Sequence, residues 1–178
     1  GPTETFYNIN VTGDPTWAAN VEIQGPHRRW AVIKNTHASA TSILKLTGKA
    51  SVKDLAFSQQ GAVSGLILTN STYRVVSCGF NSSTCSGAVN GIYLDGTAAV
   101  MVGGKIEDSQ FIGNATYTTA VKLNQSFVLE ACELNIHDAL VGISIDGAST
   151  AKNFFKNIDI GVCGTGINII DGTGTHFD

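Results

Sequence analysis

The chain has 178 residues, of which 43% are hydrophobic and 14% charged, and its formal net charge at pH 7 is −3. This length and apolar content suffice for one domain with a buried core. The low charge and the lack of a long Lys/Arg run argue against nucleic-acid binding, and no apolar run reaches the ~18 residues of a membrane-spanning helix.

The composition indicates a chain of short extended segments. Twenty glycines and three prolines fit many tight turns between strands. The first two residues, Gly1-Pro2, are typical of what remains after a purification tag is cleaved. We therefore expect residues 3–178 to form one domain that was excised from a larger protein.

Seven short segments share an apolar–any–apolar pattern that is followed by a turn residue. Their first apolar residues, separated by 23, 22, 26, 29, 22 and 24 residues, are Val21, Leu44, Leu66, Ile92, Val121, Ile143 and Ile167. A β-type alternation that recurs at this period is typical of a solenoid whose turns stack on one another. The repeat predicts an all-β fold, a single-stranded parallel β-helix of about seven turns.

A second family of strands precedes the first in most turns. Its copies are Val52–Phe57, Val75–Phe80, Ile106–Phe111 and Leu129–Leu134, with an ambiguous copy at Asn153–Ile158 and an N-terminal one at Phe6–Val11. No stretch of ten or more residues has a helical period, so no strand–helix alternation is expected.

The repeat also predicts which residues share a position in successive turns. The middle residues of the seven segments should form an outward row, which contains Glu22, Lys45, Ile67, Tyr93, Lys122, Ser144 and Asn168. A recurring corner should place Asp95, Asn124, Asp146 and Asp171 where Asx side chains bond the backbone of the turn.

One unit of the repeat resembles a known family. The segment Val75-Val76-Ser77-Cys78-Gly79-Phe80-Asn81, followed by Gly91-Ile92-Tyr93-Leu94, is similar to the rungs of right-handed parallel β-helices of the pectate-lyase-like superfamily. The resemblance covers about residues 6–172 and is greatest to a β-helix segment of a phage tailspike or viral surface protein. It implies a right-handed solenoid. Function does not follow from it, because the superfamily contains lyases, glycoside hydrolases, tailspikes and adhesins.

The four cysteines are expected to be free thiols. Cys78 and Cys132 are predicted to occupy the same inward position two turns apart, with Ser109 between them, which is too far for a disulfide. No Cys-x-x-Cys or His-x-x-x-His spacing occurs, so neither a metal site nor a cofactor is expected.

Four acidic residues of the second strand family are the candidate catalytic groups. Glu107 and Glu130 are predicted to be equivalent in adjacent turns, roughly 5 Å apart at the backbone, with Asp108 and Glu133 close by. Two carboxyl groups at that separation suit a retaining glycoside hydrolase, because one of them is then easier to protonate. The alternative is a solvated acidic strip whose repulsion is offset by Lys105 or Lys152.

A second candidate surface lies on the outward row of the first strand family. Tyr93 could stack on a sugar ring while Lys45 and Lys122 hold an acidic substituent, so these three residues are the candidate substrate-binding groups. The alternative is an ordinary mixed β-surface on which the tyrosine packs against its neighbours in adjacent turns.

These observations lead to one expected function and two alternatives. We expect a β-helix exposed on a virion or cell surface that recognises a cell-surface glycan, with hydrolysis of that glycan and side-by-side trimerisation, through outward residues such as Ile67 and Val76, as further hypotheses. The alternatives are a non-catalytic adhesin or structural solenoid, and a free-standing polysaccharide lyase. Two intervening turns, at Ile67 and Tyr93, separate Lys45 from Lys122, which weakens the lyase alternative.

Overall fold

The protein is all-β in the part of the chain that the structure describes. A computed structural model describes residues 5–9, 14–18, 20–28, 31–37, 39–69, 72–98, 101–147 and 152–178, so Gly1-Pro2 lies outside it. Every helix or strand in these ranges is a strand. Accordingly, none of the described residues belongs to a helix long and apolar enough to cross a membrane.

The strands form two parallel sheets. The seven-stranded sheet contains β2 (Thr16–Trp17), β5 (Ser42–Leu46), β8 (Ser64–Thr69), β11 (Val89–Asp95), β13 (Thr118–Asn124), β15 (Val141–Asp146) and β17 (Thr165–Ile169). The eleven-stranded sheet contains β1 (Thr5–Ile9), β3 (Val21–Gln24), β4 (Ala31–Asn35), β6 (Ala50–Lys53), β7 (Ala56–Ser58), β9 (Tyr73–Val76), β10 (Gly79–Asn81), β12 (Met101–Ile112), β14 (Ser126–His137), β16 (Phe154–Gly161) and β18 (His176–Phe177).

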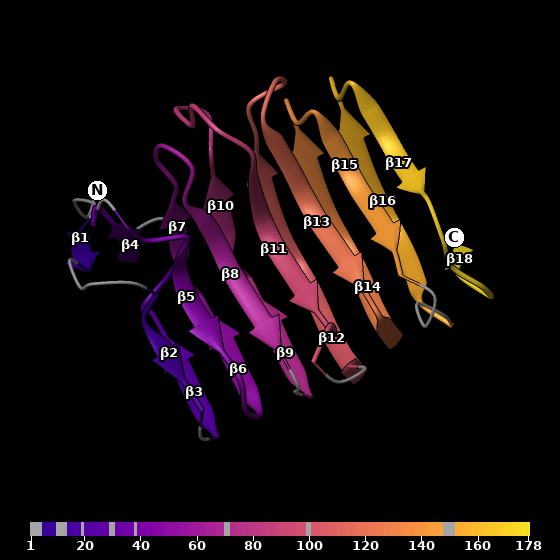
Figure 1. Cartoon of the computed structure of the whole chain (residues 1–178), viewed down its shortest axis with the longest axis horizontal. Helices are drawn as coiled ribbons and strands as arrows, with labels where there is room; N and C mark the ends of the chain where they lie inside the picture. Colours follow the sequence, from indigo (N-terminus) through magenta and orange to yellow (C-terminus); the bar gives the residue numbers. More distant parts are fainter. Residues whose placement is uncertain are drawn as a thin grey trace.

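The chain visits the two sheets in turn, and each return places a strand beside the previous one. In the seven-stranded sheet the order along the sheet is the order along the chain, from β2 to β17. Figure 1 shows the strands side by side along the long axis of the molecule, from the indigo N-terminal end to the yellow C-terminal end. This topology of parallel sheets is compatible with a parallel β-helix or solenoid.

A bend divides the eleven-stranded sheet into two faces. At the bend one residue per turn has a positive φ, at Asp54 (57°), Ser77 (51°), Asp108 (46°), Glu133 (56°) and Asn157 (52°). The strands before the bend form what we call the proximal face. It comprises β3, β6, β9, β18 and the first halves of β12, β14 and β16. The distal face comprises β1, β4, β7, β10 and the second halves of β12, β14 and β16. A single left-handed residue turns the strand direction, so the two faces point their side chains in different directions.

Apolar ladders fill the interior between the sheets. The inward side chains of β5, β8, β11, β13 and β15 are 1% exposed or less, namely Leu44, Leu46, Leu66, Leu68, Ile92, Leu94, Val121, Leu123, Ile143 and Ile145. In the last strand, β17, the residues of the same rows are 41% (Ile167) and 51% (Ile169) exposed. On the distal face three phenylalanines stack in successive turns. The ring centroids of Phe57 and Phe80 are 4.8 Å apart, and those of Phe80 and Phe111 are 4.9 Å apart. This spacing matches the distance between neighbouring strands, so each ring lies directly over the next.

The predicted register of the first strand family is confirmed for six of its seven segments. Leu44, Leu66, Ile92, Val121, Ile143 and Ile167 occupy one row. The prediction for Val21 is wrong, because Val21–Gln24 pairs with Ala50–Lys53 on the proximal face. Thr16–Trp17 takes its place in the seven-stranded sheet, and Glu22 is therefore not in the outward row. A two-residue strand is too short to show an alternation, whereas Val21–Gln24 has one.

The predicted register of the second strand family contains one slip. Val52, Val75 and Ile106 are equivalent as expected. Ile106, however, pairs with Ala131 and not with Leu129. Leu129, Ala131, Leu134 and Ile136 are all buried, so a shift of two residues keeps the same side chains inside. The apolar pattern alone could not distinguish the two registers.

The predicted alignment of the recurring corner is confirmed for three of its four residues, and backbone bonding for Asp95 and Asp146. Asp95, Asn124 and Asp146 are aligned at the ends of their strands. Asp95 Oδ1 accepts hydrogen bonds from the Thr97 backbone N–H and hydroxyl, at 3.1 and 2.7 Å. Asp171 lies beyond this row, because the residue that follows Ile169 is Ile170 and not an Asx residue.

The phenylalanine stack should dominate the stability of the distal face. Replacing the central ring by Phe80→Ala removes contacts to both neighbours and is expected to lower the free energy of unfolding by about 3–5 kcal/mol. Urea unfolding followed by circular dichroism measures this change. The control Ile170→Ala, at a position that is 65% exposed, should change it by about 0.5 kcal/mol or less. A loss below about 1 kcal/mol for Phe80→Ala would show that the rings are not stacked as described.

Candidate functional site

Two outward rows cross the proximal face. The first contains Glu22, Ser51, Arg74, Lys105, Glu130, Phe154 and His176. The second contains Gln24, Lys53, Val76, Glu107, Cys132 and Lys156. Since the rows follow from parallel pairing, side chains from segments far apart in the sequence become neighbours here.

The predicted equivalence of Glu107 and Glu130 is wrong. Glu107 pairs with Cys132, and Glu130 pairs with Lys105, as the slip of two residues in β14 requires. The two glutamates therefore lie on the same face but in different rows, displaced by two residues along the strand. At the backbone this diagonal is about 8 Å rather than the 5 Å of direct neighbours.

A lysine contacts both carboxylates, and an arginine contacts one of them. Lys105 Nζ lies 3.4 Å from Glu107 Oε2 and 3.9 Å from Glu130 Oε1. Arg74 Nη2 lies 3.6 Å from the same oxygen of Glu107. The hydrogen bond to Glu107 is the main cause that raises the pKa of Lys105, so its ammonium group stays charged near neutral pH. Lys105 thus offsets the acidic charge, as the solvated-strip alternative expects, while a catalytic role of the acids stays a prediction.

The other two predicted acids lie at the bend. Asp108 accepts hydrogen bonds from Arg28 Nη1 (3.2 Å, to Oδ1) and from the Ser77 hydroxyl (2.5 Å, to Oδ2). Arg28 Nη1 also donates to the Asp108 backbone oxygen, at 2.5 Å. These contacts tie the loop before β4 to β12, which is a structural role. Glu133 occupies the next bend and is exposed.

A cavity of about 520 Å³ adjoins Glu130 at the C-terminal part of the proximal face. Its walls include Gly103, Val128, Glu130, Phe154, Lys156 and His176. We call it the proximal cavity. Its volume lies within the range of about 300–1,000 Å³ that small-molecule sites occupy.

An exposed aromatic ring forms one wall of the proximal cavity. The Phe154 residue is 51% exposed, and its ring meets the His176 ring edge to face at a centroid distance of 6.1 Å. The neighbouring Phe155 is buried and stacks on Phe177 at 4.7 Å. Alternation along β16 therefore forces one of two adjacent phenylalanines outward. That Phe-Phe pair was the sequence signal for this site, but its ambiguous register hid which ring was exposed.

The backbone of the proximal cavity contains an unusual conformation. Val128 has a φ of 58° and is 41% exposed. A β-branched residue in the left-handed region costs of order 1–3 kcal/mol, and such residues cluster at functional sites. The cavity thus combines an aromatic surface, groups of both charges and local strain.

The structure brings together two of the three predicted substrate-binding residues. Lys122 pairs with Tyr93 in the next turn, and its Nζ lies 5.3 Å from the centroid of the tyrosine ring. Asn124 Nδ2 donates to the Tyr93 hydroxyl at 3.3 Å. Partial burial is the main cause that raises the pKa of Tyr93. Lys45 lies two strands away, with Ile67 between, so it does not share this cluster. A lysine over the ring favours the mixed β-surface alternative.

The cysteines are free thiols, but one of the predicted positions is wrong. All four cysteines lie within the described residues and none is bonded to another. Cys78 aligns with Ser109 as expected, and its backbone N–H donates to the Ser109 hydroxyl at 3.3 Å. Cys132 lies opposite Glu107 on the outward side, because of the slip in β14. Within the described ranges no three His, Cys, Asp or Glu side chains are arranged to hold a metal ion.

Comparisons with known proteins leave the family open. No family model matches this chain, and no curated protein sequence matches it either. The fold and the site therefore define a class only, an all-β protein of parallel sheets with a small cavity on one outer face.

Burial should protect two of the thiols from alkylation. It raises the pKa of both Cys78 and Cys85 to about 11. Only the thiolate is nucleophilic, so at pH 8 about one molecule in a thousand is reactive at each of these positions, a fraction that rises as the pH approaches 11. We expect iodoacetamide and peptide mass spectrometry to find the half-buried Cys163 labelled first in the native protein. Labelling of Cys78 as fast as Cys163 at pH 8 would contradict its buried position.

Proposed function

We propose that this chain is a right-handed parallel β-helix of about seven turns that recognises a cell-surface glycan on its proximal face. In this proposal it belongs to a surface or virion protein of the tailspike type. The observation that supports it is the proximal cavity beside Glu130, with a half-exposed phenylalanine ring as one wall.

The residues of the proximal cavity suit a sugar ring. The face of Phe154 offers an apolar surface for the C–H groups of a pyranose, as aromatic side chains at binding sites commonly do. Glu130 can accept hydrogen bonds from sugar hydroxyls, because its side chain is 63% exposed. Lys156 supplies an ammonium donor to the cavity, and His176 adds a polar ring whose Nε2 lies 3.2 Å from Asp178 Oδ1. Together these groups fix the orientation of a polar ligand over an apolar wall.

Recognition has more support than hydrolysis. A retaining glycosidase needs two carboxyl groups about 5–5.5 Å apart, one of which is protonated. Here Lys105 contacts both Glu107 and Glu130, and Arg74 contacts Glu107 as well. The two carboxylates are thus paired with cations rather than facing each other, and the register displaces them by two residues along the strand. Hydrolysis by the two glutamates therefore stands as a separate hypothesis with its own test.

Loss of the exposed ring should weaken glycan binding. An array of cell-surface glycans would first identify a ligand, and isothermal titration calorimetry would then measure its affinity for the wild-type chain and for Phe154→Ala. We expect at least a tenfold loss, because an aromatic contact of about 1.4 kcal/mol corresponds to a factor of ten.

A matched control separates this effect from a general loss of aromatic surface. Tyr117 lies between β12 and β13 and is 38% exposed, outside the proximal cavity. Tyr117→Ala should leave the affinity unchanged, and both variants should unfold at the wild-type temperature. Unchanged binding by Phe154→Ala, or an equal loss in Tyr117→Ala, would overturn the proposed site.

The hydrolysis hypothesis is tested on the same glycan. If the wild-type chain cleaves it, Glu107→Gln and Glu130→Gln should each lower the rate at least a hundredfold, because each removes an acid–base or nucleophilic group. Chromatography of the released oligosaccharides measures the rate. Undiminished cleavage by either variant would exclude that residue from catalysis. Binding without cleavage by the wild type would leave recognition as the function.

A further inference from the structure

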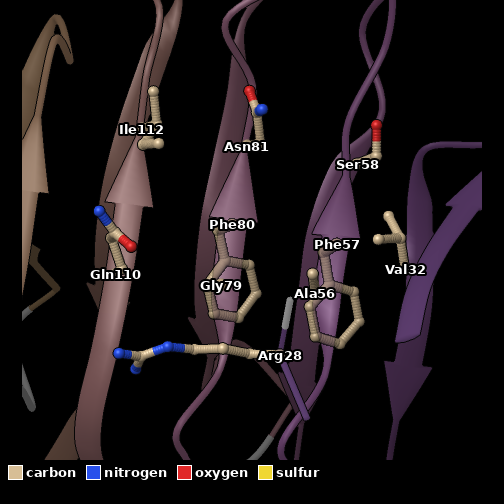
Figure 2. A pocket seen from close by; sticks show the side chains of 10 residues that line it. All are labelled: Arg28, Val32, Ala56, Phe57, Ser58, Gly79, Phe80, Asn81, Gln110 and Ile112. Carbon is tan, nitrogen blue, oxygen red and sulfur yellow. The ribbon is translucent and has the colours of Figure 1, made fainter. Parts of the chain in front are cut away.

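A second hollow lies on the distal face, beyond the bend and away from the proximal cavity. It has a volume of about 300 Å³ and lies over β7, β10 and the second half of β12. We call it the distal groove. Figure 2 shows Ser58, Asn81 and Ile112 in a row along one end of it, with Arg28 crossing the other end.

Two small residues create the distal groove. Ala56 and Gly79 are paired neighbours, and the next residue in the same row is Gln110. Ala56 contributes only a methyl group and Gly79 only a hydrogen atom, whereas Gln110 has a long polar side chain. The row is therefore lower over β7 and β10 than over β12, which leaves a depression there. Val32, which pairs with Ala56, closes the opposite side and is 7% exposed. The floor is apolar and of methyl size.

Arg28 supplies hydrogen-bond donors to the groove without adding net charge. Its ion pair with Asp108 neutralises the guanidinium, whose side chain is 27% exposed. Both of its hydrogen bonds to Asp108 use Nη1. Among the described residues, the remaining N–H groups of this guanidinium have no acceptor, so they can donate to a ligand. Figure 2 shows the side chain extended beneath Gly79 toward β12.

The amide side chains of the groove add further donors and an acceptor. Asn81 Oδ1 already accepts from the Ser83 backbone N–H and hydroxyl, at 3.1 and 2.7 Å, which leaves its Nδ2 group to donate. The Gln110 amide makes no hydrogen bond to any described residue, so it can both donate and accept. Such a site matches a neutral ligand that carries a carbonyl oxygen, an N–H group and a methyl group close together.

The pairing of the strands disfavours an extended peptide as this ligand. A peptide that adds to a sheet needs free backbone N–H and C=O groups at a sheet edge. β10 pairs with β7 on one side and with β12 on the other, and β7 also pairs with β4. The groove therefore offers side chains only, which suits a sugar that presents its substituents to one surface.

We propose that the distal groove binds a neutral acetamido sugar. The acetamido methyl group lies in the depression over Ala56 and Gly79, its carbonyl oxygen accepts from Arg28 or Asn81, and its N–H donates to Gln110. This site is separate from the proximal cavity, so the two proposals can fail independently.

An NMR titration of the full chain tests the proposal directly. The probes are the methyl glycosides of N-acetylglucosamine, N-acetylgalactosamine and N-acetylmannosamine, each beside the hexoside that lacks the acetamido group. We expect at least one acetamido sugar to cause saturable shifts of the Gly79 backbone amide and of the Asn81 and Gln110 side-chain amides. Its affinity should exceed that of the matching hexoside at least tenfold and change less than twofold between 50 and 500 mM salt, because the site is neutral.

Gly79→Leu is the blocking variant for this titration. A Cβ at this position would meet nothing closer than the Ala56 Cβ at 3.7 Å, an ordinary contact, so the strand can accept the substitution. The leucine side chain then fills the groove and should abolish binding. The control variant is Thr119→Leu, which adds the same side chain on another strand. Thr119 is a half-buried outward residue of β13 that pairs with Asn90 and Val141, so this variant should keep wild-type binding.

Each outcome decides the proposal. Saturable binding that is lost in Gly79→Leu, and kept in Thr119→Leu and Phe154→Ala, supports the distal groove. Loss in Phe154→Ala would assign the sugar to the proximal cavity instead. No saturable binding of any of the three acetamido sugars, equal affinity for the matching hexosides, or stronger binding of an N-acetylated tripeptide would overturn the proposal.

Discussion

In-register parallel pairing between successive turns is the interaction on which the rest of this structure depends. It places each inward side chain over its counterpart about 4.8 Å away, so that the rings of Phe57, Phe80 and Phe111 form one stack. It also aligns the left-handed residues of the bend, from Asp54 to Asn157, into one edge. Because one register governs both the interior and the outer faces, an error of two residues in one strand leaves the core intact but changes every neighbour on the surface.

Both candidate sites are consequences of that register rather than of any contiguous motif. The proximal cavity exists because Phe154 pairs with Glu130, a residue 24 positions earlier in the chain. The distal groove exists because Ala56 pairs with Gly79 in a row that continues to Gln110. The bend at Asp108 lies between them and directs the two sites to different sides of the molecule. Each site is formed by side chains that only the pairing of strands brings together. The two sites share no residue, so a substitution in one can remove it without altering the other.

The register of a strand was predictable from the sequence where its local alternation is strong. Leu66, Ile92 and Ile143 lie in strongly alternating segments bounded by turn residues, and their register was predictable. β14 was not, because it has two buried residues on each side of its bend, Leu129 and Ala131 before it and Leu134 and Ile136 after it, which satisfy two frames equally well. The consequence fell on the candidate site, where Glu130 meets Lys105 instead of Glu107. Phe154 could not be identified as exposed from the sequence, since the register of its strand was ambiguous. The row of Ala56, Gly79 and Gln110 follows from the register that the sequence did predict, but an alanine and a glycine carry no functional pattern that would mark a site.

Disulfide trapping at Cys132 tests the register most directly. In the structure Cys132 lies opposite Glu107, and directly paired positions of neighbouring strands are about 4.8 Å apart, within the range that a disulfide spans. The variant Glu107→Cys should therefore link to Cys132 on mild oxidation, as peptide mapping by mass spectrometry would reveal. Ser109→Cys, which points inward and pairs at Leu134, should not link to Cys132. A Cys132 linkage in Ser109→Cys but not in Glu107→Cys would contradict the register of β14 and the proximal cavity built on it.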